Sequence, residues 1–128
     1  MATINRFEDL HIWQKAREIC QNVFELCKHE NFARDFILKD QIKRSSGSVM
    51  DNIAEGHGRD GNTEFKHFLS IAKGSLNEVK SQLYRALDSG YIVTLEFNDV
   101  YEKCDKLAAR IGKFIQYIKS SDYKGTKF

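Results

Sequence analysis

Apolar residues recur at steps of three and four positions over four long segments of this chain, which is the spacing of one face of an α-helix. The pattern predicts helices at about 9–29, 39–55, 63–89 and 95–119, followed by a frayed polar tail at 120–128. Amphipathic helices joined by short connections usually pack antiparallel to their neighbours in sequence. We therefore expect an all-α fold, an antiparallel up-and-down four-helix bundle, in one domain over residues 1–128.

Several residues at the ends of these segments have helix-capping chemistry. Asp9, Asn62 and Thr94 each precede an apolar run, and each is predicted to accept a hydrogen bond from a free amide in the first turn. Gly90 is expected to end the third helix, because glycine adopts the left-handed conformation at little cost. Residues 30–35 are predicted to be a plain connection.

The first helix carries two neighbouring apolar stripes, which together are wider than one core-facing side requires. The stripe predicted for the core includes Trp13, Cys20 and Phe24, and part of the second stripe is predicted to contact another subunit. The outer face of the third helix, opposite its core stripe, supplies two further candidates. The residues predicted for oligomer contact are Ile12, Ile19, Ile71 and Gly74.

The composition narrows the function only slightly. The formal net charge of +2 is too small to indicate nucleic-acid binding by itself, so that inference depends on how charge is distributed. The absence of proline suits long helices. No apolar run approaches the ~20 residues of a membrane span, and the N-terminus lacks an apolar signal core. We expect a cytoplasmic protein with no membrane partner.

The residue types used in catalysis do not form a known pattern here. None of the four histidines has a nucleophile at a recognisable spacing, and no Glu-x-x-His pair of the di-iron type occurs. The three cysteines lack zinc-ligand spacing and are predicted to be small buried apolar residues. We therefore expect no catalytic residue, no metal site and no cofactor.

Two stretches are more specific than helical periodicity. Residues 41–56 end in Asn-Ile-Ala-Glu-Gly, and residues 64–78 contain Ala-x-Gly-Ser-Leu-x-Glu. With Asp9-Leu10-His11-Ile12-Trp13, they resemble the four-helix bundle proteins encoded in intervening sequences of bacterial 23S rRNA genes, the S23-type ribosomal protein family. The chain is also similar to the accessory protein of diversity-generating retroelements. The resemblance covers nearly the whole chain.

This resemblance implies an antiparallel bundle that assembles as a homopentamer and associates with structured RNA or a ribonucleoprotein. Such sequences often have Ser or Thr near the position of Lys39 and proline at the position of Met50. The chain has neither, so the second helix is expected to be unkinked and to fray in its first turn.

Basic residues gather in the second helix, the following loop and the start of the third helix. They are either an ordinary solvated surface or a track for RNA phosphates, and repetition around a ring would enlarge their field. Residues 100–128 also carry seven Lys or Arg against three Asp or Glu. Proteins that bind single-stranded RNA usually alternate aromatic residues, on which nucleobases stack, with Lys and Arg, and no such alternation is evident here. The candidates for nucleic-acid binding are Lys43, Arg44, Arg59, Lys66 and Lys73.

Three polar residues of the second helix, Gln41, Asn52 and Glu55, are predicted to have structural roles, because buried polar groups need hydrogen-bond partners. Ligand contact is the alternative for the two amides. The glycine-rich loop with His57 and Arg59 is predicted to be a plain turn, with a backbone anion site as its alternative.

These patterns favour a non-enzymatic, homo-oligomeric bundle that binds structured RNA or assists a ribonucleoprotein through a basic surface. A protein–protein scaffold with no direct nucleic-acid role is the main alternative. A regulatory or toxin–antitoxin-like partner is a third.

Overall fold

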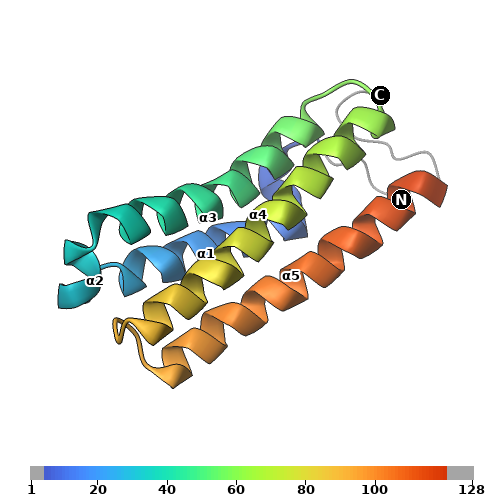
Figure 1. Ribbon diagram of the computed structural model, residues 1–128. Coiled ribbons are helices and arrows are strands. Elements are labelled where there is room, and N and C mark those ends of the chain that lie inside the picture. The colour runs from blue at the N-terminus through green and yellow to red at the C-terminus, as the bar shows by residue number, and fades with distance from the viewer. Residues whose placement is uncertain (1–4, 121–128) are drawn as a thin grey trace.

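The computed structural model describes residues 5–120 as four long helices with two short helical segments (Figure 1). The long helices run antiparallel to their neighbours in sequence, and the described residues contain no strand. The antiparallel four-helix bundle is therefore as predicted, while the tail at 121–128 lies outside the described residues. The segments are the 3₁₀ turn η1 (Phe7–Asp9), α1 (His11–Leu26), α2 (Glu30–Arg34), α3 (Phe36–His57), α4 (Asn62–Asp88) and α5 (Thr94–Ser120).

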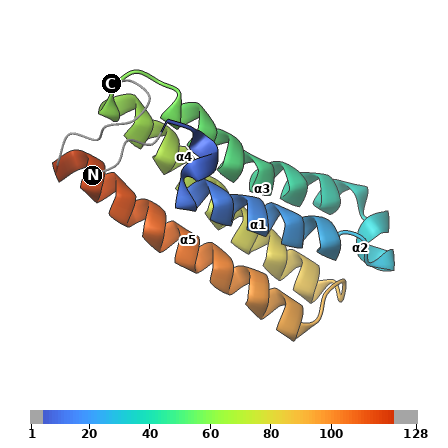
Figure 2. The same ribbon diagram turned by 180° about the vertical axis from the view of Figure 1, so that it is seen from behind.

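Each long helix contacts two others, so the four form a closed square around one core. Helix α1 packs on α3 and α5, and α4 packs on the same two helices from the other side (Figure 2). The predicted stripes of α3 and α4 fill this core, from Leu38 to Ile53 and from Phe65 to Leu83. None of the described helices is long and apolar enough to cross a membrane.

The core-facing side of α1 differs from the prediction. Ile12 and Ile19, assigned above to a subunit contact, are only 6% and 1% exposed, and they lie in the core of the single chain. Phe24, assigned to the core, is 52% exposed. The reason is that α1 packs on two neighbours, α3 and α5, so its buried arc is centred on the second stripe.

The three predicted N-caps are also corrected. Asp9 belongs to the 3₁₀ turn η1, and α1 begins two residues later, after the extended residue Leu10. Asn62 is already helical, because Gly61 at φ +97° turns the chain one residue earlier. Helix α5 includes Thr94, and the backbone amide of the preceding residue donates instead to Glu96 Oε1 at 3.0 Å.

The predicted connection at 30–35 contains a short helix. Phe32 is fully buried and stacks on Tyr91 with ring centroids 5.4 Å apart, which anchors α2 against the bundle. Asp35 then caps α3 by accepting a hydrogen bond from the amide of Leu38 at 3.0 Å. The expected frayed start at Lys39 is wrong, because Lys39 lies inside a helix that begins three residues earlier.

Two glycines are needed by the backbone, one where α3 approaches α4 and one where α4 ends. A Cβ at Gly56 would lie 2.8 Å from Phe68 Cβ and 2.9 Å from Phe65 Cδ1, so the close approach of the two helices requires glycine there. Gly90 has φ +76° directly after the last turn of α4, as predicted for the residue that ends this helix.

Candidate nucleic-acid interface

The five predicted RNA-binding residues do not form one surface. The Lys43 amine lies 4.9 Å from the ring of Phe24 on α1, whereas the Lys73 amine lies against α5, 3.6 Å from where a Cβ on Gly112 would stand. The other two residues named from α3 and its loop are already neutralised. Arg44 pairs with Asp40 at 2.8 Å and Arg59 pairs with Glu55 at 2.9 Å.

Two of the five, Lys66 and Lys73, share a stripe of α4 that borders α5. They are spaced by seven residues, and Lys80 continues the same stripe. Lys80 contacts α5 directly through a 2.6 Å ion pair with Asp105. Of the predicted basic residues, Lys73 therefore lies with α5, whereas those of α3 lie elsewhere.

Charge is segregated along α5. Its first half, 94–105, holds four acids and Lys103, whereas its second half, 106–119, holds four bases and no acid. Three of the four acids have a basic or imidazole partner: Glu96 contacts His29, Asp99 contacts Lys103, and Asp105 contacts Lys80. Within residues 5–120, the bases of the second half have no acidic partner, so their charge is not compensated.

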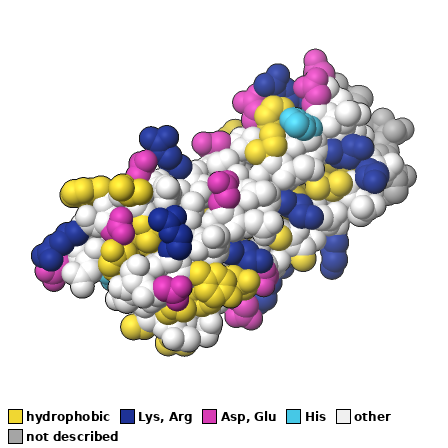
Figure 3. Space-filling view, in the orientation of Figure 1, with side chains coloured by type: hydrophobic (Ala, Val, Ile, Leu, Met, Phe, Trp, Pro, Cys, Tyr) yellow, Lys and Arg dark blue, Asp and Glu magenta, His cyan; other side chains and the backbone are white. Residues whose placement is uncertain are grey.

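These bases adjoin cations from both neighbouring helices. A groove of about 240 Å³ between α1 and α5 is lined by Lys15, Lys106 and Arg110 over a floor of Ile19 and Leu107. Figure 3 shows Lys and Arg side chains spread over the second half of α5 and the adjoining part of α4. We call this set the α5 surface, and its members are Lys15, Lys73, Lys106, Arg110 and Lys113.

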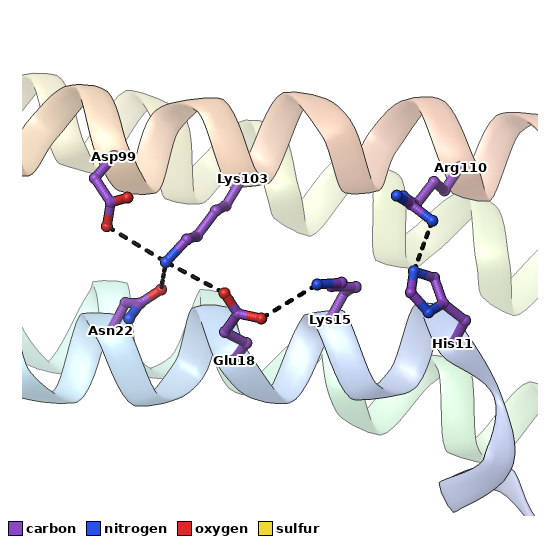
Figure 4. A network of polar contacts seen from close by, with 7 residues as sticks. All are labelled: His11, Lys15, Glu18, Asn22, Asp99, Lys103 and Arg110. Carbon is purple, nitrogen blue, oxygen red and sulfur yellow. Dashed lines mark hydrogen bonds and ion pairs between the residues drawn. The ribbon is translucent and has the colours of Figure 1, made fainter.

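A polar network closes one end of the groove (Figure 4). The Lys103 amine lies 3.0 Å from Asn22 Oδ1, 3.2 Å from Glu18 Oε2 and 3.4 Å from Asp99 Oδ2. The hydrogen bond from Lys103 holds the pKa of Glu18 below its usual value. Glu18 also lies 3.5 Å from the Lys15 amine, so among the residues that line the groove only Lys106 and Arg110 have no acidic partner.

At the opposite end of the groove, the Arg110 guanidinium donates to His11 Nε2 at 2.6 Å (Figure 4). Desolvation and the charges of Arg110 and Lys15 lower the pKa of His11. A neutral imidazole therefore orients Arg110 toward the groove while adding no charge.

Of the residues predicted for oligomer contact, only Ile71 and Gly74 are on the outside of the chain, on α4. A Cβ at Gly74 would meet nothing within 4 Å. Ile12 and Ile19 are unavailable to another subunit because they are buried in the chain's own core.

The residues named for structural roles bind neighbouring protein groups. Asn52 Nδ2 donates to the Ser48 carbonyl at 2.8 Å and lies 2.9 Å from Ser48 Oγ, which in turn lies 2.9 Å from Ser75 Oγ on α4. Gln41 Oε1 accepts from Arg85 at 2.8 Å. The Glu55 carboxylate makes the exposed pair with Arg59 already described.

The glycine loop and the cysteines show no ligand chemistry. His57, assigned to the loop, is the last residue of α3 and is buried, with its ring edge-on to Phe65. Cys27 and Cys104 are buried as expected, and burial raises the pKa of Cys104 to about 12, whereas Cys20 is only partly buried and its thiol donates to the Ser46 carbonyl at 3.1 Å. No cluster of three His, Cys, Asp or Glu suited to a metal occurs within residues 5–120.

Sequence reasoning missed the uncompensated half of α5, although the signal was present. Residues 100–128 show a basic excess in the sequence, but two of the first-half acids pair with residues distant in sequence, Glu96 with His29 and Asp105 with Lys80. The sequence also gave no sign of exposed aromatic rings beside lysines on α1 and α3, which the structure places together.

Comparison with known proteins gives one family and one similar structure. A family model described as "23S rRNA-intervening sequence protein" matches residues 8–113. The fold is similar to a crystal structure from Bacteroides thetaiotaomicron, a protein of unknown function from the S23 ribosomal protein family, with TM-score 0.76 and 23% identity. The match covers 81% of this chain and 97% of that one. No curated protein matches the chain.

Proposed function

The chain belongs to the 23S rRNA-intervening sequence protein family, and on that basis we propose that it binds structured RNA through the α5 surface. The observation that carries the proposal is the uncompensated charge of Lys106, Arg110 and Lys113, in a half-helix without a single acid. Clustered like charges repel one another, so a polyanion is the partner that relieves them. The side chains of Lys106 and Arg110 line the groove, so a phosphate chain lying across its mouth would be within reach of both cations.

The proposed binding is dominated by phosphates. The cations of the α5 surface come from α1, α4 and α5, so they follow a curved strip instead of one helix face. Arg110 is the member suited to bidentate phosphate contact, because its guanidinium presents a planar fork of donors. Lysines supply point charges without base recognition, so selectivity would come from RNA shape.

Charge reversal tests this function. In a gel-shift assay with nuclease-treated protein and a labelled RNA stem–loop, Lys106→Glu/Lys113→Glu is expected to weaken binding by about tenfold or more. The matched control is Arg34→Glu/Arg44→Glu, because both arginines already pair with an acid four residues earlier in their own helix. Equal loss in the control, or no shift at low salt with wild-type protein, would rule the proposal out.

Self-assembly is part of the proposal, because repetition of the α5 surface around a ring multiplies its contacts. Ile71, 39% exposed, and Gly74 remain the predicted residues for a subunit contact on α4. Ile71→Glu is expected to lower the mass measured by light scattering. An unchanged mass would remove this face from consideration.

A protein scaffold is the second candidate, and one observation favours it. Ile37, Val93 and Leu95 are 71%, 62% and 80% exposed, at the end of the bundle where α3 and α5 begin. A contiguous apolar patch commonly marks a protein contact, and three exposed apolar side chains at one end of the bundle could contribute to such a patch. Retention of a protein partner without RNA after nuclease treatment would support this reading.

A further inference from the structure

Two phenylalanines stand on the surface at the end of the bundle remote from the basic half of α5. Phe24 on α1 is 52% exposed and Phe36 on α3 is 71% exposed. Other phenylalanines of the chain, such as Phe32 and Phe65, are buried. The exposure of these two rings therefore does not follow from the needs of the core.

Lysine amines lie over both rings. Lys28 and Lys43 are each 4.9 Å from the centroid of Phe24, and Lys39 is 5.1 Å from the centroid of Phe36. These are cation–π distances, so the rings lie among positive charges. We call this set the aromatic–lysine row, and its members are Phe24, Lys28, Phe36, Lys39 and Lys43.

The row is continuous because of helix geometry. Phe36, Lys39 and Lys43 are at positions i, i+3 and i+7 of α3, which places them on one side over about 10 Å of axial rise. The Lys43 amine extends the row to Phe24 on α1. The order along the surface is ring, cation, cation, ring.

The charge of the row is only partly compensated. Lys28 pairs with Glu25 at 3.1 Å, and the nearby Asp40 pairs with Arg44 at 2.8 Å. Within residues 5–120, Lys39 and Lys43 have ring contacts but no acidic partner. Their long flexible side chains can move from a ring face to an adjacent phosphate, which frees the ring.

We propose that the aromatic–lysine row binds an unpaired segment of RNA, with nucleobases stacked on Phe24 and Phe36 and phosphates held by Lys39 and Lys43. This inference rests on the proposed function for RNA as the partner. Aromatic rings beside cations form the stacking platforms of single-strand binding proteins, whereas bases inside a duplex already stack on each other. The row therefore selects unpaired nucleotides, and the α5 surface accepts any phosphate chain.

The experiment compares two probes by fluorescence anisotropy. One is a single-stranded RNA with a central 2-aminopurine, and the other is a blunt-ended, fully paired RNA stem made of two strands. Phe24→Leu/Phe36→Leu keeps apolar side chains but removes the rings. It is expected to weaken single-strand binding about tenfold and to abolish the 2-aminopurine quenching, with little change on the stem.

Two controls separate stacking from general surface effects. Phe24→Tyr/Phe36→Tyr keeps the aromatic faces and is expected to bind as wild type. Leu95→Ala removes an even more exposed apolar side chain outside the row and is expected to leave the binding of both RNA probes unchanged. All variants change exposed positions, and thermal melts by circular dichroism check that they remain folded.

The outcomes distinguish this inference from the proposed function. If the leucine variant binds single-stranded RNA as tightly as wild type, the proposed role of the aromatic–lysine row is wrong. This holds even if Lys106→Glu/Lys113→Glu abolishes binding of the stem. Loss in the leucine variant with no effect of the α5 variant supports the row and overturns the α5 surface. A third outcome is that wild type binds phosphatidylserine vesicles and the leucine variant does not, while both bind RNA equally. The row would then be a membrane contact, and the proposal that it binds RNA would be wrong.

Discussion

Arg110 on α5 donates a hydrogen bond to Nε2 of His11 on α1 across 2.6 Å, and this contact requires that nitrogen to be unprotonated. Protonation of His11 would replace an acceptor with a positive charge facing Arg110 and near Lys15. The junction between α1 and α5 therefore responds to pH at a residue that lies beside the α5 surface.

The first prediction concerns this histidine. Its native pKa lies below the ordinary value of 6.5, so the unfolded chain binds the proton more readily. Stability contributed by the neutral form is complete above about pH 6.5 and is lost as the pH falls toward the lowered pKa. His11→Gln should lose less thermal stability than wild type between pH 7.5 and 5.5. The measurement is the melting temperature of each protein as a function of pH, and parallel curves for His11→Gln and wild type would contradict this prediction.

A pair of glycine substitutions tests the approach of α3 to α4. Gly56→Ala is expected to destabilise the protein by about 1–3 kcal/mol, because the new methyl would overlap Phe65 and Phe68. Gly47→Ala, in the same helix with nothing within 4 Å of the new methyl, is expected to stabilise by about 0.5–1 kcal/mol. Urea unfolding measures both, and the same sign for the two changes would refute the packing explanation.

The contact between two hydroxyl groups of α3 and α4 is expected to contribute measurably to the free energy of unfolding. Ser75 is buried and lies 2.9 Å from Ser48 through their Oγ atoms. Ser75→Ala is expected to cost about 1 kcal/mol, because Ser48 loses a partner. Ser70→Ala, exposed on the same helix, should be neutral or slightly stabilising. Combining Ser75→Ala with Ser48→Ala should cost less than the sum, and strict additivity would show that the two hydroxyls are not coupled.

Salt dependence checks the phosphate character of RNA binding. If the five cations of the α5 surface each contact a phosphate, affinity for a paired stem should fall roughly 10²- to 10³-fold between 50 and 200 mM salt. Lys106→Glu/Lys113→Glu should flatten the slope of log affinity against log salt. A slope near zero for wild type would mean that binding does not depend on phosphates.

Periodicity was sufficient to predict the bundle, because each long helix buries one continuous stripe. The stripes of α3 and α4 needed no knowledge of their neighbours, as Ile42 and Leu76 illustrate. Periodicity failed for α1, because two adjacent stripes of this helix are both apolar. Only the packing of α1 on both α3 and α5 determines that Ile19 is buried and Phe24 is exposed.

The sites were harder to predict because they depend on partners distant in sequence. The Arg44–Asp40 pair can be read from its spacing of four residues, but the pairing of Lys80 with Asp105 joins α4 to α5 and no spacing within one helix reveals it. The aromatic–lysine row joins Phe24 to Lys43 across two helices, so spacing along either helix could not reveal it.

The division of charge along α5 also affects the helix itself. The peptide dipoles of a helix sum to a partial positive charge at its N-terminus and a partial negative charge at its C-terminus. Glu96 in the first turn and Lys119 in the last each face the opposite pole. The same order of acids and bases that leaves cations free for a ligand therefore stabilises the α5 backbone, so removing those cations should weaken the last turns of α5 as well as binding.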